Sequence, residues 1–101
     1  MPYLVRTLPR AERDLQSTFY FTQAQAASAA IDWFNGLAVS ISTLAHHPAR
    51  CAGTPENPKF RQLLYGSKPH IYRIIFFLDE ESKQVNIVHV RHGARSGLGI
   101  H

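Results

Sequence analysis

The residues best suited to chemistry lie in the second half of the chain and carry basic or imidazole side chains. They are Arg61, Lys68, Arg73, His89, Arg91, His92 and Arg95. Arg and Lys stabilise negative charge on a phosphate in a transition state, and His transfers protons near neutral pH. These residue types are the equipment of a metal-free ribonuclease, and equally of a surface that docks onto an acidic partner. A solvated basic face has the same composition, so the residues alone leave three interpretations open.

Three strands are expected to position these side chains. Residues 71–78, IYRIIFFL, are β-branched and aromatic, and residues 85–90, VNIVHV, follow after the polar connection DEESKQ. Both faces of the 71–78 segment are apolar, which predicts a strand in the centre of its sheet. A third run, residues 60–65, ends at the turn-forming sequence GSKP. Three strands with short connections predict an antiparallel meander.

Arg73 interrupts the apolar pattern of its strand. Its guanidinium must reach solvent, a nearby acid or a ligand, because an unpaired buried Arg is costly. Counting back from an Asp79–Gln84 pair in the hairpin places Arg73 opposite Val90, with His92 as its diagonal neighbour on the same face. A shift of one residue places it beside His89 and Arg91 instead. Either register brings Arg73 close to the basic end of the last strand.

The first half of the chain is expected to cover this sheet. A short strand over residues 3–8 precedes a helix that Pro9 opens, near residues 9–20. A longer helix near residues 24–46 has an apolar stripe at helical spacing and must end near His47, before Pro48. Gly36 within it is interpreted as a close helix crossing, and Trp33 as a satellite core residue rather than a partner-binding one.

Length and composition favour one small domain spanning residues 1–101, with a net charge of +4. The last twenty residues contain no acid, which permits an acidic partner. Cys51 is the only cysteine, and the N-terminus has no apolar region typical of a secretory signal. No apolar run approaches the roughly 20 residues of a membrane span. We therefore expect a cytoplasmic protein with no membrane association.

Motifs for metals, nucleotides and acyl transfer are missing. His89 and His92 are three residues apart, so a continuous strand sends them to opposite faces, and Cys51 has no CxxC partner. The sequence contains no GxSxG, P-loop or GxGxxG motif. No metal and no cofactor are therefore expected.

Three segments resemble those of the RelE/ParE toxin superfamily of bacterial type II toxin–antitoxin modules. They are Leu63-Leu64-Tyr65-Gly66, Tyr72-Arg73-Ile74 and Val90-Arg91-His92-Gly93-Ala94-Arg95. The resemblance covers nearly the whole chain and implies an α+β fold of order β-α-α-β-β-β, with a helical hairpin packed on an antiparallel sheet. It also implies a toxin that is neutralised by a cognate antitoxin encoded beside it, which for a ParE-like toxin is ParD-like.

The superfamily has two main activities, and the end of the chain favours one of them. RelE-like members cleave mRNA on the ribosome with basic residues and often a C-terminal Tyr, whereas ParE-like members inhibit DNA gyrase. Arg73 matches the Arg common to both, but Gly93 stands near the expected catalytic Arg, and no Tyr follows Tyr72. The HGAR segment is more similar to ParE-type sequences. The resemblance therefore favours a gyrase inhibitor, with a ribosome-dependent mRNA endonuclease as the alternative.

The two activities assign different roles to the basic residues. For a gyrase inhibitor the expected target-binding residues are Arg61, Arg73, Arg91 and Arg95. For a ribonuclease the expected catalytic residues are Arg73, Arg91 and His92, with His89 as a further acid–base candidate. A folded, antitoxin-binding homologue without toxicity is a third possibility that the sequence leaves open.

Overall fold

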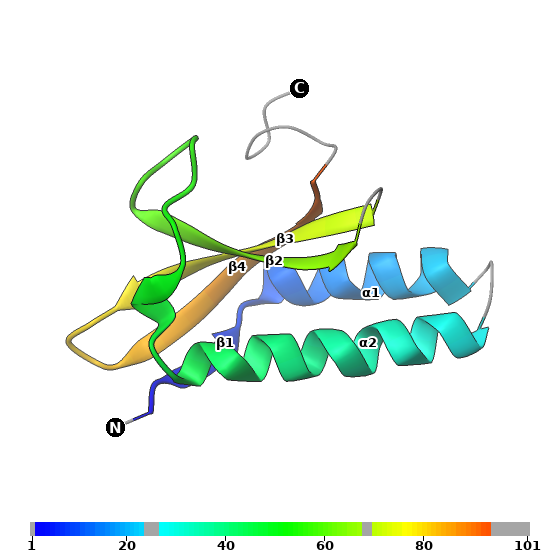
Figure 1. Cartoon of the computed structure of the whole chain (residues 1–101), viewed down its shortest axis with the longest axis horizontal. Helices are drawn as coiled ribbons and strands as arrows, with labels where there is room; N and C mark the ends of the chain where they lie inside the picture. The colour runs from blue at the N-terminus through cyan, green and yellow to red at the C-terminus, as the bar shows by residue number, and fades with distance from the viewer. Residues whose placement is uncertain (1, 24–26, 68–69, 94–101) are drawn as a thin grey trace.

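The chain folds into two helices packed on a four-stranded sheet (Figure 1). The computed structural model describes residues 2–23, 27–67 and 70–93. Along the chain the elements are β1 (Leu4–Thr7), α1 (Pro9–Gln23), α2 (Ala27–Ser42), the short 3₁₀ turns η1 (Thr43–Ala45) and η2 (Pro48–Arg50), β2 (Phe60–Ser67), β3 (His70–Asp79) and β4 (Gln84–His92). This order confirms the predicted strand, two helices and three strands, although α2 stops earlier than expected and continues as η1.

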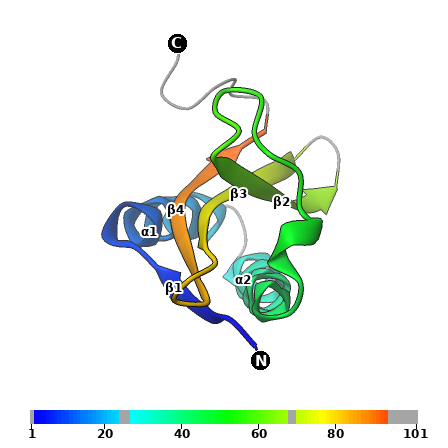
Figure 2. The ribbon, with the colours of Figure 1, turned by 90° about the vertical axis from the view of Figure 1, so that its left-hand side faces the viewer.

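The strand order in the sheet is β1-β4-β3-β2 (Figure 2), so β3 is an interior strand as its two apolar faces predicted. Strands β2, β3 and β4 form the expected antiparallel meander. Strand β1 pairs with β4 in the parallel direction, which makes the sheet mixed rather than wholly antiparallel. The helices between β1 and the meander supply the long connection that such a parallel pair needs.

A β-bulge in β4 sets the register of the basic residues. Asp79 pairs with Gln84 as predicted, but Val88 is an extra residue, because Ile75 pairs with His89 while Phe76 pairs with Ile87. Beyond the bulge the register is shifted by one residue. Arg73 therefore lies opposite Arg91, as the register shifted by one residue predicted, and its expected place opposite Val90 is wrong.

The hydrophobic core lies between the helices and one face of the sheet. Both helices lie on the same side of the strands in Figure 1, and Leu37 and Leu44 are fully buried against that face. The buried strand residues of this cluster are Ile74, Phe76, Val85, Ile87 and Val90. The other face of the sheet, here called the open face, carries Arg73 and the exposed side chains of Leu64 and Phe77.

Aromatic side chains join α2 to the strands. Trp33 packs edge-on against Tyr65 and Tyr72, with ring centroids 5.5 and 5.0 Å apart, so it belongs to the edge of the core as expected. Tyr65 donates a hydrogen bond of 2.8 Å to the carbonyl oxygen of Trp33. A Cβ atom on Gly36 would collide with the Tyr65 hydroxyl. The close approach at Gly36 is therefore to β2, and its interpretation as a helix crossing was wrong.

Within the described residues, no helix is both long enough and apolar enough to cross a membrane.

Candidate functional site

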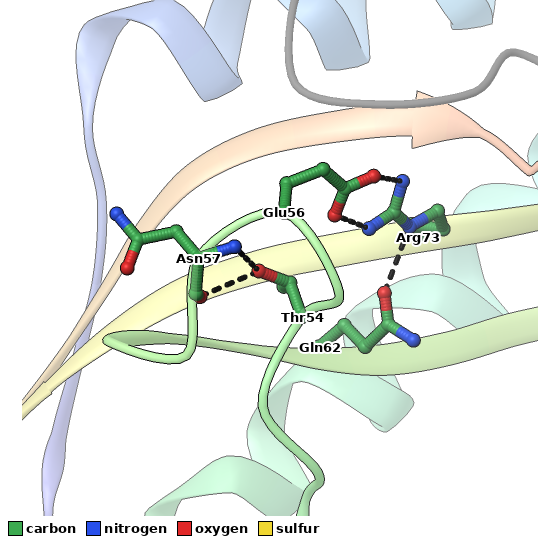
Figure 3. Close-up of polar contacts among 5 residues, drawn as sticks. All are labelled: Thr54, Glu56, Asn57, Gln62 and Arg73. Atoms are coloured by element: carbon green, nitrogen blue, oxygen red, sulfur yellow. Dashed lines mark hydrogen bonds and ion pairs between the residues drawn. The ribbon is translucent and has the colours of Figure 1, made fainter.

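Arg73 is held in a clamp on the open face of the sheet (Figure 3). Its two terminal nitrogens donate to the Glu56 carboxylate at 3.0 and 2.7 Å, and its Nε donates to Gln62 Oε1 at 2.8 Å. Arg73 is only 8% exposed. Of the possibilities for this residue, the nearby acid is the one that the structure shows. Its guanidinium is thus occupied within the chain, and its role in target binding stays a prediction.

The loop before β2 carries Glu56 to this position. Thr54 N–H donates to the Phe60 carbonyl at 2.8 Å, so the loop lies along the edge of β2. The Thr54 hydroxyl then donates to the Asn57 carbonyl at 2.7 Å and accepts from the Asn57 N–H at 3.1 Å, which closes a tight turn around Glu56. Figure 3 shows the Glu56 carboxylate facing the Arg73 guanidinium. The sequence predicted only an irregular loop here and missed Glu56.

Arg61 forms hydrogen bonds with the beginning of the same loop. Its Nη1 donates to the carbonyl oxygens of Cys51 at 2.6 Å and Ala49 at 3.2 Å. These bonds hold η2 against β2, because backbone carbonyls at the end of a short helix otherwise lack donors. Arg61 was expected to bind a target, and the structure shows its guanidinium in contact with the loop.

Arg91 is the basic residue of the open face without a counter-charge. It lies directly opposite Arg73 and is half-buried. Its Nε is buried and has no hydrogen-bond partner among the described residues. Glu56 is engaged with both terminal nitrogens of Arg73, and no described acid forms an ion pair with Arg91.

His89 lies two residues before Arg91 on the same face, and its Nδ1 is 3.6 Å from Asp14 Oδ2. That nitrogen is buried and makes no hydrogen bond to a described residue. Burial lowers the pKa of His89, and the positive charges of Arg10 and Arg91 lower it further, against the opposing effect of Asp14. The imidazole is therefore biased toward its neutral form.

Asp14 connects α1 to the free edge of β4. Its Oδ2 accepts a hydrogen bond of 3.1 Å from the Val90 N–H, and its Oδ1 is 3.6 Å from Arg10 Nε. Strand β1 pairs with β4 only as far as Ile87, so the carboxylate replaces a strand partner at Val90. This role depends on the packing of α1 beside β4, which local sequence does not reveal.

His92 faces the other side of the sheet from Arg73 and Arg91. It pairs in register with Tyr72, and the two rings pack edge-on at 5.0 Å. The structure therefore gathers Arg73, His89 and Arg91 on one face, and places His92 on the helix-covered face. Lys68 and Arg95 lie outside the described residues.

Comparison with known proteins assigns the family. The model of the ParE toxin of the type II toxin–antitoxin system parDE matches residues 5–97. The chain belongs to the ParE toxin family. No curated protein matches the sequence significantly.

Two solved structures show the same fold as this ParE-family chain. A chain of the chromosomal ParDE toxin–antitoxin system from P. aeruginosa superposes with a TM-score of 0.73 at 17% identity, covering 89% of this chain and 95% of that one. A chain of the RelBE2 toxin–antitoxin complex from Mycobacterium tuberculosis superposes with a TM-score of 0.57 at 24% identity, covering 91% and 99%. These likenesses confirm the expected α+β fold of the superfamily.

The structure explains why position 93 of this ParE-family chain is a glycine. Its N–H donates a 2.6 Å hydrogen bond to the Ile71 carbonyl oxygen. A Cβ at this position would lie only 2.8 Å from the same oxygen. Any side chain here would force β3 and β4 apart, so the position expected for a catalytic Arg does not accommodate one without a shift of the backbone.

Within residues 2–23, 27–67 and 70–93, no group of three or more His, Cys, Asp or Glu side chains is arranged to hold a metal ion. Among the described residues, the open face of this ParE-family chain carries the guanidinium groups of Arg73 and Arg91, the Glu56 carboxylate and the His89 imidazole.

Proposed function

We propose that this ParE-family toxin inhibits DNA gyrase and is neutralised by a ParD-like antitoxin. The observation that carries the gyrase proposal is the clamp on Arg73. A ribonuclease of the RelE type would need this guanidinium against a phosphate. Here each of its three nitrogens already donates a hydrogen bond to Glu56 or Gln62.

The energetic cost of freeing Arg73 supports this choice. The side chains of Arg73 and Glu56 are only 10% and 15% exposed. Breaking a buried ion pair by removing one partner costs about 3–5 kcal/mol, because a charge is left uncompensated. A substrate phosphate would have to offset that cost before it gained any net contact with Arg73.

Gly93 supports the same choice independently. The backbone of β3 lies too close for a side chain at this position, so the backbone geometry itself disfavours an Arg at position 93. No Tyr follows Tyr72 in the chain, so the phenol often used by RelE-like members is also missing. Both departures concern the nuclease chemistry and leave a protein-binding role unaffected.

The antitoxin proposal is supported by exposed apolar surface and by charge. Ile31 and Val39 on α2 are 55% and 65% exposed. The last twenty residues carry Lys, Arg and His without any acid, so they do not repel an acidic segment. The named relatives of known structure come from a ParDE system and a RelBE2 complex, which supports an antitoxin as the partner.

The test of the target is a pair of assays on one preparation of the purified toxin. DNA supercoiling by purified gyrase is measured with increasing toxin, beside cleavage of mRNA on programmed ribosomes. We expect supercoiling to be inhibited and mRNA to remain intact. Normal supercoiling together with cleavage at the ribosomal A site would overturn the proposal.

A ribosome-dependent ribonuclease is the second candidate, and Glu56 is the observation that favours it. A carboxylate lies on the same face as Arg73, Arg91 and His89, and a carboxylate base with cations is what metal-free RNA cleavage uses. On this reading Glu56→Gln would abolish cleavage while the fold is retained. If the parent chain cleaves mRNA and Glu56→Gln cleaves it equally well, Glu56 is not the base.

A further inference from the structure

We propose that Arg91, Arg10 and His89 form a binding site for a phosphate group at the free edge of β4. The three side chains come from β4 and from α1, which packs beside it. Arg91 is also an expected target-binding residue, but phosphate binding is measured on the chain without gyrase, so failure of this proposal is distinguishable from failure of the proposed function.

The first support is electrostatic imbalance at Arg91. A half-buried guanidinium without a counter-charge is unfavourable, since burial removes water that would otherwise solvate it. Its cross-strand neighbour Arg73 has taken the Glu56 carboxylate. No described acid forms an ion pair with Arg91, and its buried Nε has no hydrogen-bond acceptor among the described residues. A bound anion would supply the missing charge.

The second support is that Asp14, the carboxylate beside Arg10 and His89, already has partners. Asp14 accepts the Val90 N–H at 3.1 Å through Oδ2 and lies 3.6 Å from Arg10 through Oδ1. It is shared further with His89, whose Nδ1 is 3.6 Å from Oδ2. One acid among Arg10, His89 and Arg91 leaves the edge positive even when the imidazole is neutral.

The shape of the donor set favours phosphate over carboxylate. The donors come from two elements, with Arg10 on α1 and His89 and Arg91 on β4. A tetrahedral phosphate presents three or more acceptor oxygens in different directions, whereas a carboxylate presents two in one plane. The clamp at Arg73 shows what a carboxylate does on this sheet, which is to pair with a single guanidinium in one bidentate contact.

The test is a titration of the purified full-length chain with inorganic phosphate, followed by NMR at the Val90 amide and the His89 imidazole. We expect saturable shifts at both, and an increase of the His89 pKa on saturation, because a bound anion stabilises the imidazolium. Sodium chloride at matched ionic strength is the control for screening. Shifts that rise linearly without saturation, or that chloride reproduces, would overturn the proposal.

Substitutions at Arg91 test whether phosphate binds at the proposed site. Arg91→Gln should weaken phosphate binding at least about tenfold, which corresponds to roughly 1.4 kcal/mol. Arg91→Lys keeps the charge and should retain part of the affinity, so it separates binding from a folding defect. The matched control is Lys59→Gln, because Lys59 is an exposed cation in the loop before β2. Equal loss in the Lys59 and Arg91 variants would refute a localised site.

Two further ligands distinguish the source of the phosphate. A short single-stranded oligonucleotide that binds at least about tenfold more tightly than inorganic phosphate, at the same residues, would identify a nucleic-acid phosphodiester. Equal affinity per phosphate would identify a small phosphorylated molecule. An acidic peptide that shifts the same signals saturably while phosphate does not would overturn the proposal in favour of a protein partner.

Discussion

At the scale of single residues, the basic side chains that look alike in the sequence have different tasks. Arg73 and Arg61 make contacts within the chain. Arg73 pairs with Glu56, and Arg61 donates to the Cys51 carbonyl oxygen at the end of η2. Arg91 is the residue whose charge is not compensated by any described neighbour. An arginine count therefore overestimates the basic surface that a partner can meet.

The clamp predicts a large effect of Glu56 on stability. Glu56→Ala should lower the free energy of unfolding by about 3–5 kcal/mol, because it leaves the nearly buried Arg73 unpaired. Glu56→Gln keeps an acceptor oxygen and should cost less. Urea unfolding of both variants measures the difference, and the double variant Glu56→Ala with Arg73→Met should recover most of the loss. A Glu56→Ala variant as stable as the parent chain would contradict the clamp.

The lowered pKa of His89 predicts a loss of stability in mild acid. Burial lowers its pKa in the folded chain, whereas the unfolded chain keeps the ordinary value of about 6.5. Between the two values the unfolded state binds more protons, so the free energy of unfolding falls as the pH drops below about 6.5. The groups that face this imidazole are Arg10, Asp14 and Arg91.

The measurement is urea unfolding of the parent chain and of His89→Gln at pH 7.5 and pH 5.5. The decrease between the two pH values should be smaller in His89→Gln. An identical decrease in both proteins would show that other groups cause the acid sensitivity.

At the scale of elements, contacts between distant segments determine where side chains end up. The bulge at Val88 decides which residue faces Arg73, and the turn around Thr54 brings Glu56 to the open face. Asp14 holds the edge of β4 from a helix that is 76 positions away in sequence from Val90. Each of these contacts needs two elements already in place.

The contact between α2 and β2 predicts an unusual effect of alanine. In an exposed helix, Gly→Ala stabilises by about 1 kcal/mol. Gly36→Ala should instead destabilise this protein, because the new Cβ would displace the Tyr65 hydroxyl and break its bond to Trp33. The expected loss is about 1–3 kcal/mol, the usual cost of overpacking.

Removing the hydroxyl provides the control. In a Tyr65→Phe background the obstructing oxygen is gone and only the ring carbon Cζ, 3.3 Å from the new Cβ, stays close, so Gly36→Ala should cost much less there. Thermal unfolding of the four proteins forms a double-mutant cycle. Additive effects of the two changes would show that Gly36 and Tyr65 do not interact.

At the scale of the whole molecule, charge and apolar surface are distributed unevenly. The acids end at Glu81, so the end of the chain is entirely basic, while α2 has only Asp32 as a charged residue. A small protein with exposed apolar residues on a nearly uncharged helix is suited to binding another chain. We expect the proposed antitoxin to bind this surface of α2.

We expect a substitution at Arg91 to lower toxicity without lowering stability. If its guanidinium contacts the target through paired hydrogen bonds, Arg91→Lys should weaken growth inhibition, because Lys lacks the planar fork. The thermal midpoint should stay almost unchanged, since Arg91 makes no hydrogen bond or ion pair with a described residue.

The measurements are colony formation after induction and thermal unfolding of the purified variant, with Lys59→Arg as a matched surface control. Full toxicity of Arg91→Lys, or a large fall in its midpoint, would contradict a role at the target.

The sequence by itself determined the order of the elements and the central place of β3. Those properties follow from hydrophobic periodicity and strand-forming residues, which are local signals. The family resemblance was likewise visible in short segments such as Tyr72-Arg73-Ile74. Gly93 was visible as a departure from the RelE pattern, but its reason, the carbonyl oxygen of Ile71, was not.

Only the tertiary structure decided which charges meet. A single extra residue at Val88 moved Arg73 from Val90 to Arg91, because strand register has a period of two and one residue reverses the facing side. Glu56 and Asp14 gave no local signal of their roles, since a carboxylate in a loop or helix looks the same whether or not a distant strand needs it. Pairing between segments far apart in the chain is set by packing, and packing is a property of the whole fold.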